Sequence, residues 1–531
     1  MSPLEARDRF VKVAVLGVVS IAAIIFAFIL STSQGLVVLA IMGTFWVASL
    51  PKHAELCMNV ATATLAAGLL VPFLPGRPLI WEAAGLLGWS GMLFRIALRR
   101  YHPNFGAELK RNILVIFCMA FYSAVLVFLM RHYGVGFGSF GSADAGGRRY
   151  VTQLICAIFP LVYLLLLPSE KTITYLFIWQ CILSLSYIPS EFIVNYGRGA
   201  SRYLLLFFEA SSDAWDFANV GANYGLRRVQ AFYIVTAWMS SLLLVFVPLR
   251  KFFTFRGAWA AVVGAALVVV GGLSGHRYTL YSVAALYSVV GWVQRLYRPI
   301  YLSVLVPLVA AFVVTAYVVA PSVPESMQRV LTVLPGIRVG SRAYMDAEAG
   351  LEGRRLLWRH AMNIAPKYLW VGRGYGVSAD ADLTRKYDNT ESLASNGIFY
   401  NGTLGLLVNS GIPGLVSMMA VVLFGFAICW RVFRYVRKYR WEDRFALVCT
   451  VLSANYVTIA FSFIFLHGDS EYAMKAFCPH LGLLMACEYR LRLRDREARG
   501  LGKEFPEAAV EVIPPAVAEA RERLLPVGGR V

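Results

Sequence analysis

Long apolar stretches, each ended by charged residues, proline or glycine, divide most of the 531-residue chain. Each stretch is close to the roughly 20 residues that an α-helix needs to cross the hydrocarbon core of a bilayer. A continuous apolar run of this length is typical of a membrane-spanning helix. We therefore predict about fourteen spans, at 11–31, 35–50, 57–74, 79–98, 112–130, 151–167, 172–188, 229–248, 257–274, 278–294, 299–320, 411–430, 445–466 and 473–489.

The predicted fold is all-α: a polytopic integral membrane protein with about 12–14 transmembrane helices and one large extracytoplasmic loop. Composition agrees, because 58% of the residues are apolar and only 15% are charged, against about 25% charged in soluble domains. A soluble fold is excluded. The least typical spans are 35–50, which is short, and 151–167, which contains Pro160. Removing both would leave the predicted orientation unchanged.

The polar segments suggest four regions. These are a transmembrane bundle at 1–320, a large outer loop with short helices at 321–410, further transmembrane helices at 411–489, and a partly disordered cytoplasmic tail at 490–531. A second outer segment, 189–228, contains an apolar patch at 203–208 that we expect to lie in the membrane interface. The loop at 321–410 is the only sizeable polar region between spans, and such insertions often carry binding and catalytic residues.

The formal net charge of +19 is first of all a topology signal in a membrane protein, because cytoplasmic loops are enriched in Lys and Arg. Alternate short loops are basic, most strongly the loop at 431–444. This pattern places both termini in the cytoplasm. The sequence contains no P-loop or dinucleotide-binding fingerprint, and we expect no nucleic-acid partner, cofactor or metal site.

The positive-inside rule does not explain the arginines on the predicted outer side of the membrane. Arg277 lies in a short outer turn between two apolar spans, where the positive-inside rule disfavours it. A guanidinium that points into a cavity between helices suits bidentate recognition of a phosphate or diphosphate. The alternative is that Arg277 extends to the lipid headgroups. Further outer arginines are Arg198, Arg202, Arg354, Arg355 and Arg373.

The loop contains one segment with a recognisable pattern, residues 350–376. We predict a helix from Glu352 to Ala365, ended by Pro366, with an apolar stripe of Leu357, Ala361 and Ile364. Arg354 and Trp358 lie one turn apart. The glycines that follow, Gly372, Gly374 and Gly376, flank Arg373 in a turn that is expected to expose N–H groups to an oxyanion. An ordinary glycine-rich turn is the alternative.

Three pieces in this order resemble the O-antigen ligase and polymerase superfamily of bacterial envelope glycosyltransferases. Ser274 to Arg277 is similar to its Ser-Arg turn before the large periplasmic loop. The loop of the superfamily contains Gly-Arg followed by Trp, which is matched here by Gly353, Arg354 and Trp358. Its Gly-x-Gly turn is matched by Gly372, Gly374 and Gly376. The ligases' His-Asn pair and later Gly-x-x-Gly correspond to Tyr400-Asn401 and residues 411–414. The motifs cover residues 260–430.

The resemblance implies a metal-independent transferase in the bacterial inner membrane. Its donor would be a glycan linked to undecaprenyl diphosphate, and an acceptor hydroxyl on a glycan or lipid would attack the anomeric carbon with inversion. Arginines stabilise the leaving group in place of a metal ion. The implied catalytic residues are Arg277, Arg354, Tyr400 and Asn401. The implied diphosphate- and glycan-binding residues are Arg355, Trp358, Gly372, Arg373, Gly374, Gly376, Arg198 and Arg202.

The sequence departs from the ligase pattern at Tyr400, which stands at the histidine position. A tyrosine has an ordinary pKa near 10 and is a poor general base at neutral pH, so polymerisation or a different acceptor stays open. Substitute bases are Glu391, Asp388, His360, His467 and Glu471.

Two other hypotheses remain. A transporter or flippase of lipid-linked glycans would also be long and apolar, but it should show two similar halves or charges at mid-membrane, and neither is evident. A member of the superfamily with a degenerate site is the third hypothesis.

Overall fold

The computed structural model of the chain describes residues 52–500, apart from 73, 75–76, 99–100, 135–146, 198, 210–228, 376–392, 395–396, 441, 467 and 469. The described part is all-helical and contains no strand. Seven of its helices are long and apolar enough to cross a membrane. The predicted spans 11–31 and 35–50 lie outside the described residues, so the total of 12–14 spans stays a prediction.

The helices occur where the apolar pattern predicts them along most of the chain. The first half contains α3 (His53–Ala63), α4 (Ile80–Ala97), α5 (Phe105–Arg111), α6 (Ile113–Tyr133), α7 (Gly147–Leu166), α8 (Glu170–Leu183), α9 (Tyr187–Tyr196) and the 3-10 helix η3 (Gly199–Leu206). The second half contains η4 (Leu249–Phe253) and the α-helices α11 (Ala231–Phe246), α12 (Ala258–Gly272), α13 (Tyr278–Val293), α14 (Pro299–Val319), α15 (Glu325–Leu331), α16 (Ser341–Tyr368), α19 (Gly402–Tyr439), α20 (Arg444–Phe465) and α21 (Ser470–Ala498).

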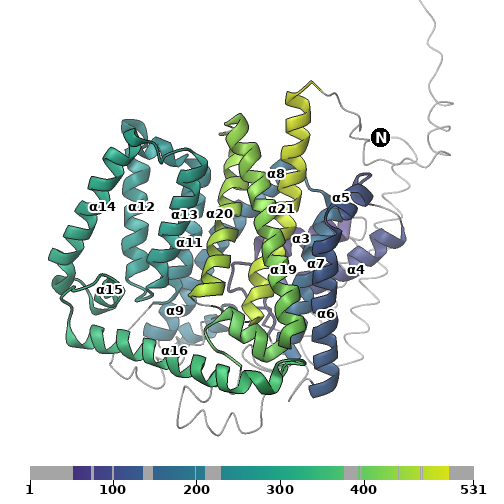
Figure 1. Ribbon diagram of the computed structural model, residues 1–531, viewed down its shortest axis with the longest axis horizontal. Coiled ribbons are helices and arrows are strands. Elements are labelled where there is room, and N and C mark those ends of the chain that lie inside the picture. Colours follow the sequence, from purple (N-terminus) through teal and green to yellow (C-terminus); the bar gives the residue numbers. More distant parts are fainter. Residues whose placement is uncertain are drawn as a thin grey trace, which may run out of the picture.

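The main core lies between α7, α19, α20 and α21, with α6 against α19 (Figure 1). Large side chains such as Phe159, Tyr163 and Phe477 are fully buried there. α11 to α14 form a second group of helices beside this core. The side chains of α14 are mostly exposed and apolar, as expected for a helix that faces lipid.

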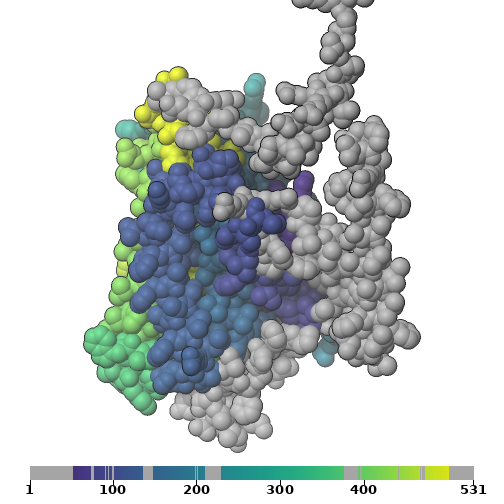
Figure 2. Space-filling model, turned by 90° about the vertical axis from the view of Figure 1, so that its right-hand side faces the viewer, coloured from purple at the N-terminus to yellow at the C-terminus, as the bar shows by residue number. Residues whose placement is uncertain are grey.

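Residues 320–375, mostly from the predicted outer loop, contain the helices α15 and α16 and lie at one end of the bundle. α16 runs across the lower ends of the helices in Figure 1 and contacts α15 and α19. Figure 2 shows α16 and the C-terminal part of α21 at opposite ends of the molecule. The segment with the richest motifs is therefore ordered and packed on the bundle.

The other end gathers residues from loops that are predicted to be cytoplasmic. Arg492 forms an ion pair with Glu108, and Arg431 lies 2.7 Å from Glu488. Lys438 lies 2.9 Å from Asp495. These pairs bring segments that are predicted to be cytoplasmic together at one end of the bundle, opposite the end where α16 lies. Which end faces the cytoplasm stays a prediction.

The bounds of α3, α19 and α21 differ from the prediction. α19 begins at Gly402, inside the predicted loop 321–410, and extends to Tyr439, well past the predicted span 411–430. α3 ends at Ala63, so the predicted span 57–74 is wrong in its second half. There the backbone forms two isolated bridges, Leu69 with the distant Phe208 and Leu70 with the nearby Leu79. α21 continues to Ala498 although the charged tail was expected to begin at residue 490, because ion pairs such as Arg492 to Glu108 hold its last turns against the bundle.

Candidate functional site

Three arginines from separate elements lie close together at the N-terminal end of α13. Arg277 directly precedes α13, Arg329 belongs to α15 and Arg354 to α16. Arg329 forms an ion pair with Asp346 of α16 and donates to the Gly275 carbonyl. We call Arg277, Arg329, Arg354 and Asp346 the arginine cluster.

The fold directs Arg277 toward protein rather than toward headgroups. Its guanidinium donates to the Ala347 carbonyl in α16. A loop with Gly275 in the left-handed region, at φ 72°, brings the chain from α12 to α13, and the Ser274 hydroxyl accepts a hydrogen bond from the His276 N–H at 3.1 Å. The sequence prediction that Arg277 points inward is therefore supported by its contacts.

Arg354 connects the arginine cluster to the start of α19. Its guanidinium lies over the Tyr400 ring, 5.9 Å from the ring centre, in cation–π geometry. Tyr400 has a left-handed φ of 48°, and the next residue, Asn401, caps α19 by accepting a hydrogen bond from the Leu404 N–H at 3.0 Å. The structure thus brings Arg277, Arg354, Tyr400 and Asn401 to one region, through the packing of α16 on α19.

Positive charge in the arginine cluster is incompletely balanced. Burial lowers the pKa of Arg277, and the charges of Arg329 and Arg354 lower it further. Burial also lowers the pKa of Arg354, against an opposing effect of Tyr400, and Arg329 lowers it further. Guanidinium groups stay protonated in proteins. Within the described residues neither Arg277 nor Arg354 forms an ion pair, so an anion bound between them would relieve the repulsion.

Two buried polar atoms near these residues along the chain have no hydrogen-bond partner in the described part of the protein. They are Nε1 of Trp358, one helical turn after Arg354, and the Thr403 hydroxyl in the first turn of α19. Buried polar groups are normally satisfied. Both are therefore candidates for hydrogen bonds to a ligand.

The predicted oxyanion nest at the glycine turn is wrong for the described glycines. The N–H of Gly372 donates to Tyr368, that of Arg373 to Val408 at 2.9 Å, and that of Gly374 to Asn409 at 2.9 Å. Gly376 lies outside the described residues. These N–H groups already have acceptors in the protein because the turn pairs with the break in α19.

That break is at Gly411, whose φ of 66° and ψ of −174° interrupt the helix. This backbone conformation is essentially restricted to glycine. A Cβ at Gly411 would lie 3.0 Å from the Gly372 nitrogen and the Trp370 oxygen. Glycine is therefore needed in both motifs because the backbone of the glycine turn at Gly372 approaches the backbone at Gly411 closely.

Gly411→Ala should lower the free energy of unfolding by about 1–3 kcal/mol, the cost of a strained backbone conformation. Gly353→Ala is the matched control, because a Cβ there meets nothing within 4 Å and alanine favours a helix by about 1 kcal/mol over glycine. Denaturant unfolding in detergent micelles measures both. Equal stability of the two variants would contradict the role given to Gly411.

Arg373 has different neighbours. It donates to the Ala394 carbonyl at 2.8 Å. Burial lowers its pKa, against an opposing effect of Tyr368, and the charge of Arg149 lowers it further. Arg149, at the start of α7, is fully buried and lies over the Tyr375 ring at 5.0 Å. The Arg373 side chain thus joins the glycine turn to the segment that precedes α19.

α16 is longer than predicted. It begins at Ser341 and continues past Pro366 to Tyr368, so the prediction that Pro366 ends the helix is wrong. A proline in the last turn removes only one internal hydrogen bond. The predicted apolar stripe is confirmed, because Leu357 and Ala361 are buried and Ile364 packs against them.

Arg355 points away from this stripe. Its side chain is 69% exposed and lies 3.7 Å from Glu352 of the same helix. We therefore expect Arg355→Ala to keep any activity of the protein within about threefold, since exposed ion pairs contribute about 0–1 kcal/mol. The assay is product formation at equal protein levels. A loss comparable to that of Arg354→Ala would place Arg355 in the site.

Two other predicted residues, Arg202 and His360, are not brought to the arginine cluster. Arg202 is exposed in η3, and His360 is exposed on α16. Four further predicted residues lie outside the described part of the chain: Arg198, Asp388, Glu391 and His467. The side chain of Glu471 lies outside it as well. Sequence reasoning missed Arg329 and Asp346. Arg329 could have been identified from the sequence, because it is one more arginine in the predicted outer loop.

No known protein family matches the chain, and no curated protein matches it either.

Proposed function

We propose that the chain is a membrane glycosyltransferase that transfers or polymerises a glycan linked to undecaprenyl diphosphate at the outer face of the bacterial inner membrane. The observation that carries this proposal is the pair Arg277 and Arg354. Both are half-buried at one end of a helical bundle, and neither has a carboxylate partner within the described residues. The resemblance of the sequence motifs to O-antigen ligases and polymerases supports the same function.

The chemistry requires stabilisation of a leaving group. The acceptor hydroxyl forms a bond to the anomeric carbon while the bond from that carbon to the diphosphate oxygen breaks, and negative charge grows on the departing diphosphate. Positioned guanidinium groups stabilise such charge and bind phosphate oxygens in pairs. Arg277 and Arg354 would take this role, with Arg329 held beside them by Asp346.

The acceptor side of the proposed site is formed by groups on α16 and at the start of α19. Tyr400 lies under Arg354, and Trp358 offers a buried N–H without a protein partner. The Asn401 oxygen is used as a helix cap, which leaves its amide nitrogen to contact a sugar. The acceptor hydroxyl loses its proton as the new bond forms, and this proton would pass to an oxygen of the departing diphosphate or to water. We propose these groups as orienting residues.

A transporter or flippase of lipid-linked glycans is the second candidate. The observation in its favour is the break in α19 at Gly411, because transporters bind substrates at discontinuous helices. Here, however, the backbone N–H next to the break already has an acceptor within the protein, because the Ile412 N–H donates to the Leu369 carbonyl at 2.7 Å. This occupancy favours a structural role for the break.

The proposed side of the membrane can be tested by cysteine labelling in a Cys118→Ala background, since the other seven native cysteines are buried. Ser341→Cys, exposed at the start of α16, should react with a membrane-impermeant thiol reagent in intact spheroplasts. Arg256→Cys, exposed near the opposite end, should react only after lysis. The reverse pattern would contradict the topology.

The function itself is tested by deletion of the gene in its host and gel analysis of surface polysaccharide. Loss of long chains with intact short units indicates a polymerase. Loss of the attached polysaccharide, with accumulation of lipid-linked glycan, indicates a ligase. A normal polysaccharide profile would contradict both activities.

A further inference from the structure

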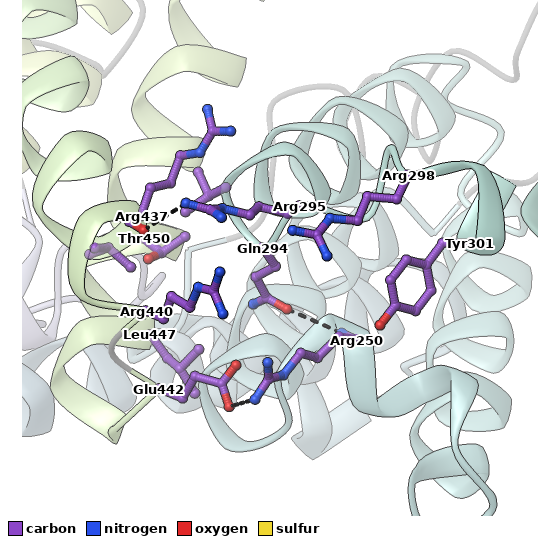
Figure 3. A pocket seen from close by; sticks show the side chains of 12 residues that line it. Arg250, Gln294, Arg295, Arg298, Tyr301, Arg437, Arg440, Glu442, Leu447 and Thr450 are labelled. Carbon is purple, nitrogen blue, oxygen red and sulfur yellow. Dashed lines mark hydrogen bonds and ion pairs between the residues drawn. The ribbon is translucent and has the colours of Figure 1, made fainter.

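A second basic site lies at the end of the bundle opposite α16. A cavity of about 110 Å³ lies there, well above the roughly 10–15 Å³ that one water needs. Figure 3 shows the side chains that line it. Among the described residues that line it, one is acidic, Glu442. The lining also includes five arginines: Arg250 in η4, Arg295 and Arg298 between α13 and α14, Arg437 in the last turn of α19, and Arg440 directly after that helix.

Three of the five arginines have partners in the protein. Arg250 forms an ion pair with Glu442. Arg295 donates to the Arg437 carbonyl at 3.3 Å, and the Arg437 guanidinium lies 4.3 Å from the centre of the Trp292 ring. These contacts fix the wall of the cavity and pair the one acidic group among its described lining residues.

The other two, Arg298 and Arg440, form no ion pair and no side-chain hydrogen bond within the described residues. Figure 3 shows their side chains extending into the cavity from opposite sides. Gln294 adds a third donor. Its Oε1 accepts from the Arg250 N–H at 3.1 Å, while its buried Nε2 has no partner in the described part of the chain. The cavity therefore presents two guanidinium groups and an amide N–H, the donors that a phosphate group needs.

The surroundings favour a lipid as the source of that phosphate. Trp292 and Trp430 stack at 5.5 Å beside the cavity, and Trp430 is half exposed. Tryptophans gather at the level of the headgroups. A neighbouring cavity of about 580 Å³ shares Arg295 and Arg437 with the first and adds Arg431 and Arg434. Basic pockets between membrane helices bind anionic headgroups.

We propose that the cavity around Arg298 and Arg440 binds the phosphate of an anionic phospholipid headgroup, in the leaflet opposite the arginine cluster. Topology alone requires only that these loops be basic. It does not require two arginines and an unsatisfied amide to converge on one cavity. The site does not depend on the proposed function, because it involves neither the glycan donor nor any residue of the arginine cluster.

The test is native mass spectrometry of the purified full-length protein in detergent, titrated with phosphatidylglycerol or phosphatidylcholine. We expect selective binding of phosphatidylglycerol, weakened about 30-fold in R298A/R440A because each basic residue contributes about 1 kcal/mol to such binding. R298K/R440K keeps the charge but loses the planar fork, so binding should be intermediate. The lysine variant also provides the test of the site if R298A/R440A fails to fold.

The control is R256A/K251A, which removes two exposed charges at the same end but outside the cavity. It should bind phosphatidylglycerol as the wild type does. An equal loss in the control, or unchanged binding by both cavity variants, would overturn the site. Displacement of bound phosphatidylglycerol by excess inorganic phosphate would overturn the lipid as the ligand, whereas retention supports it.

Discussion

Arg354→Ala should lower the rate of glycan transfer by about 10²–10³-fold, the usual cost of removing one preorganised stabiliser of a developing negative charge. Arg354 is half-buried over Tyr400, and no described carboxylate pairs with it. Arg277→Ala should have a similar effect, because the two guanidinium groups are proposed to bind one diphosphate. The double variant should be little worse than either single variant, since residues that act as a unit are not additive.

Arg359→Ala is the matched control for this prediction. Arg359 lies on the same helix and carries the same charge, but its side chain is exposed. Arg354→Lys should fall between the wild type and Arg354→Ala, because lysine cannot bind two oxygens as a planar fork. The measurement is product formed per amount of membrane-inserted protein. Equal rates for Arg354→Ala and Arg359→Ala would contradict the role of the arginine cluster.

Asp346→Ala should lower the free energy of unfolding by about 3–5 kcal/mol, because it leaves the buried guanidinium of Arg329 without its partner. The side chains of Arg329 and Asp346 are only 12% and 10% exposed. Without the carboxylate, three arginines would face one another with no acidic residue among them. Unfolding in mixed detergent micelles measures the change.

Glu352→Ala is the control for Asp346→Ala. Glu352 is an exposed acidic residue of α16, 3.7 Å from Arg355, and its loss should cost about 0–1 kcal/mol. Arg329→Met combined with Asp346→Ala should recover part of the stability, since replacing both partners of a buried pair by apolar groups is often close to neutral. A double variant less stable than Asp346→Ala would show that Arg329 does not need this partner.

The apolar pattern predicted most described helices because membrane spans are continuous apolar runs, readable without knowledge of their neighbours. It failed at 64–74, where the chain turns and pairs with residues near 208. That pairing depends on a segment more than a hundred positions away, which no local pattern contains. α21 is the opposite case, since distant ion pairs continue a helix through a charged sequence.

The candidate site was predictable in part. Arg277 stood out because its turn should avoid arginine, and Arg354 and Tyr400 lay in recognisable motifs. Asp346 could not be identified, because its role arises only when α15 folds back and brings Arg329 to α16. The glycine turn was misread for a related reason: its N–H groups are taken by the break at Gly411, and the sequence does not show which segments meet there.

The most direct test of the account uses the purified protein in proteoliposomes with lipid-linked glycan extracted from the host's own membranes. Release of free undecaprenyl diphosphate, coupled to growth or attachment of the glycan, is the quantity to measure. We predict release by the wild type and by Arg359→Ala, and at least 100-fold slower release by Arg354→Ala. Movement of intact lipid-linked glycan across the bilayer with no release of undecaprenyl diphosphate would contradict the account and indicate a flippase.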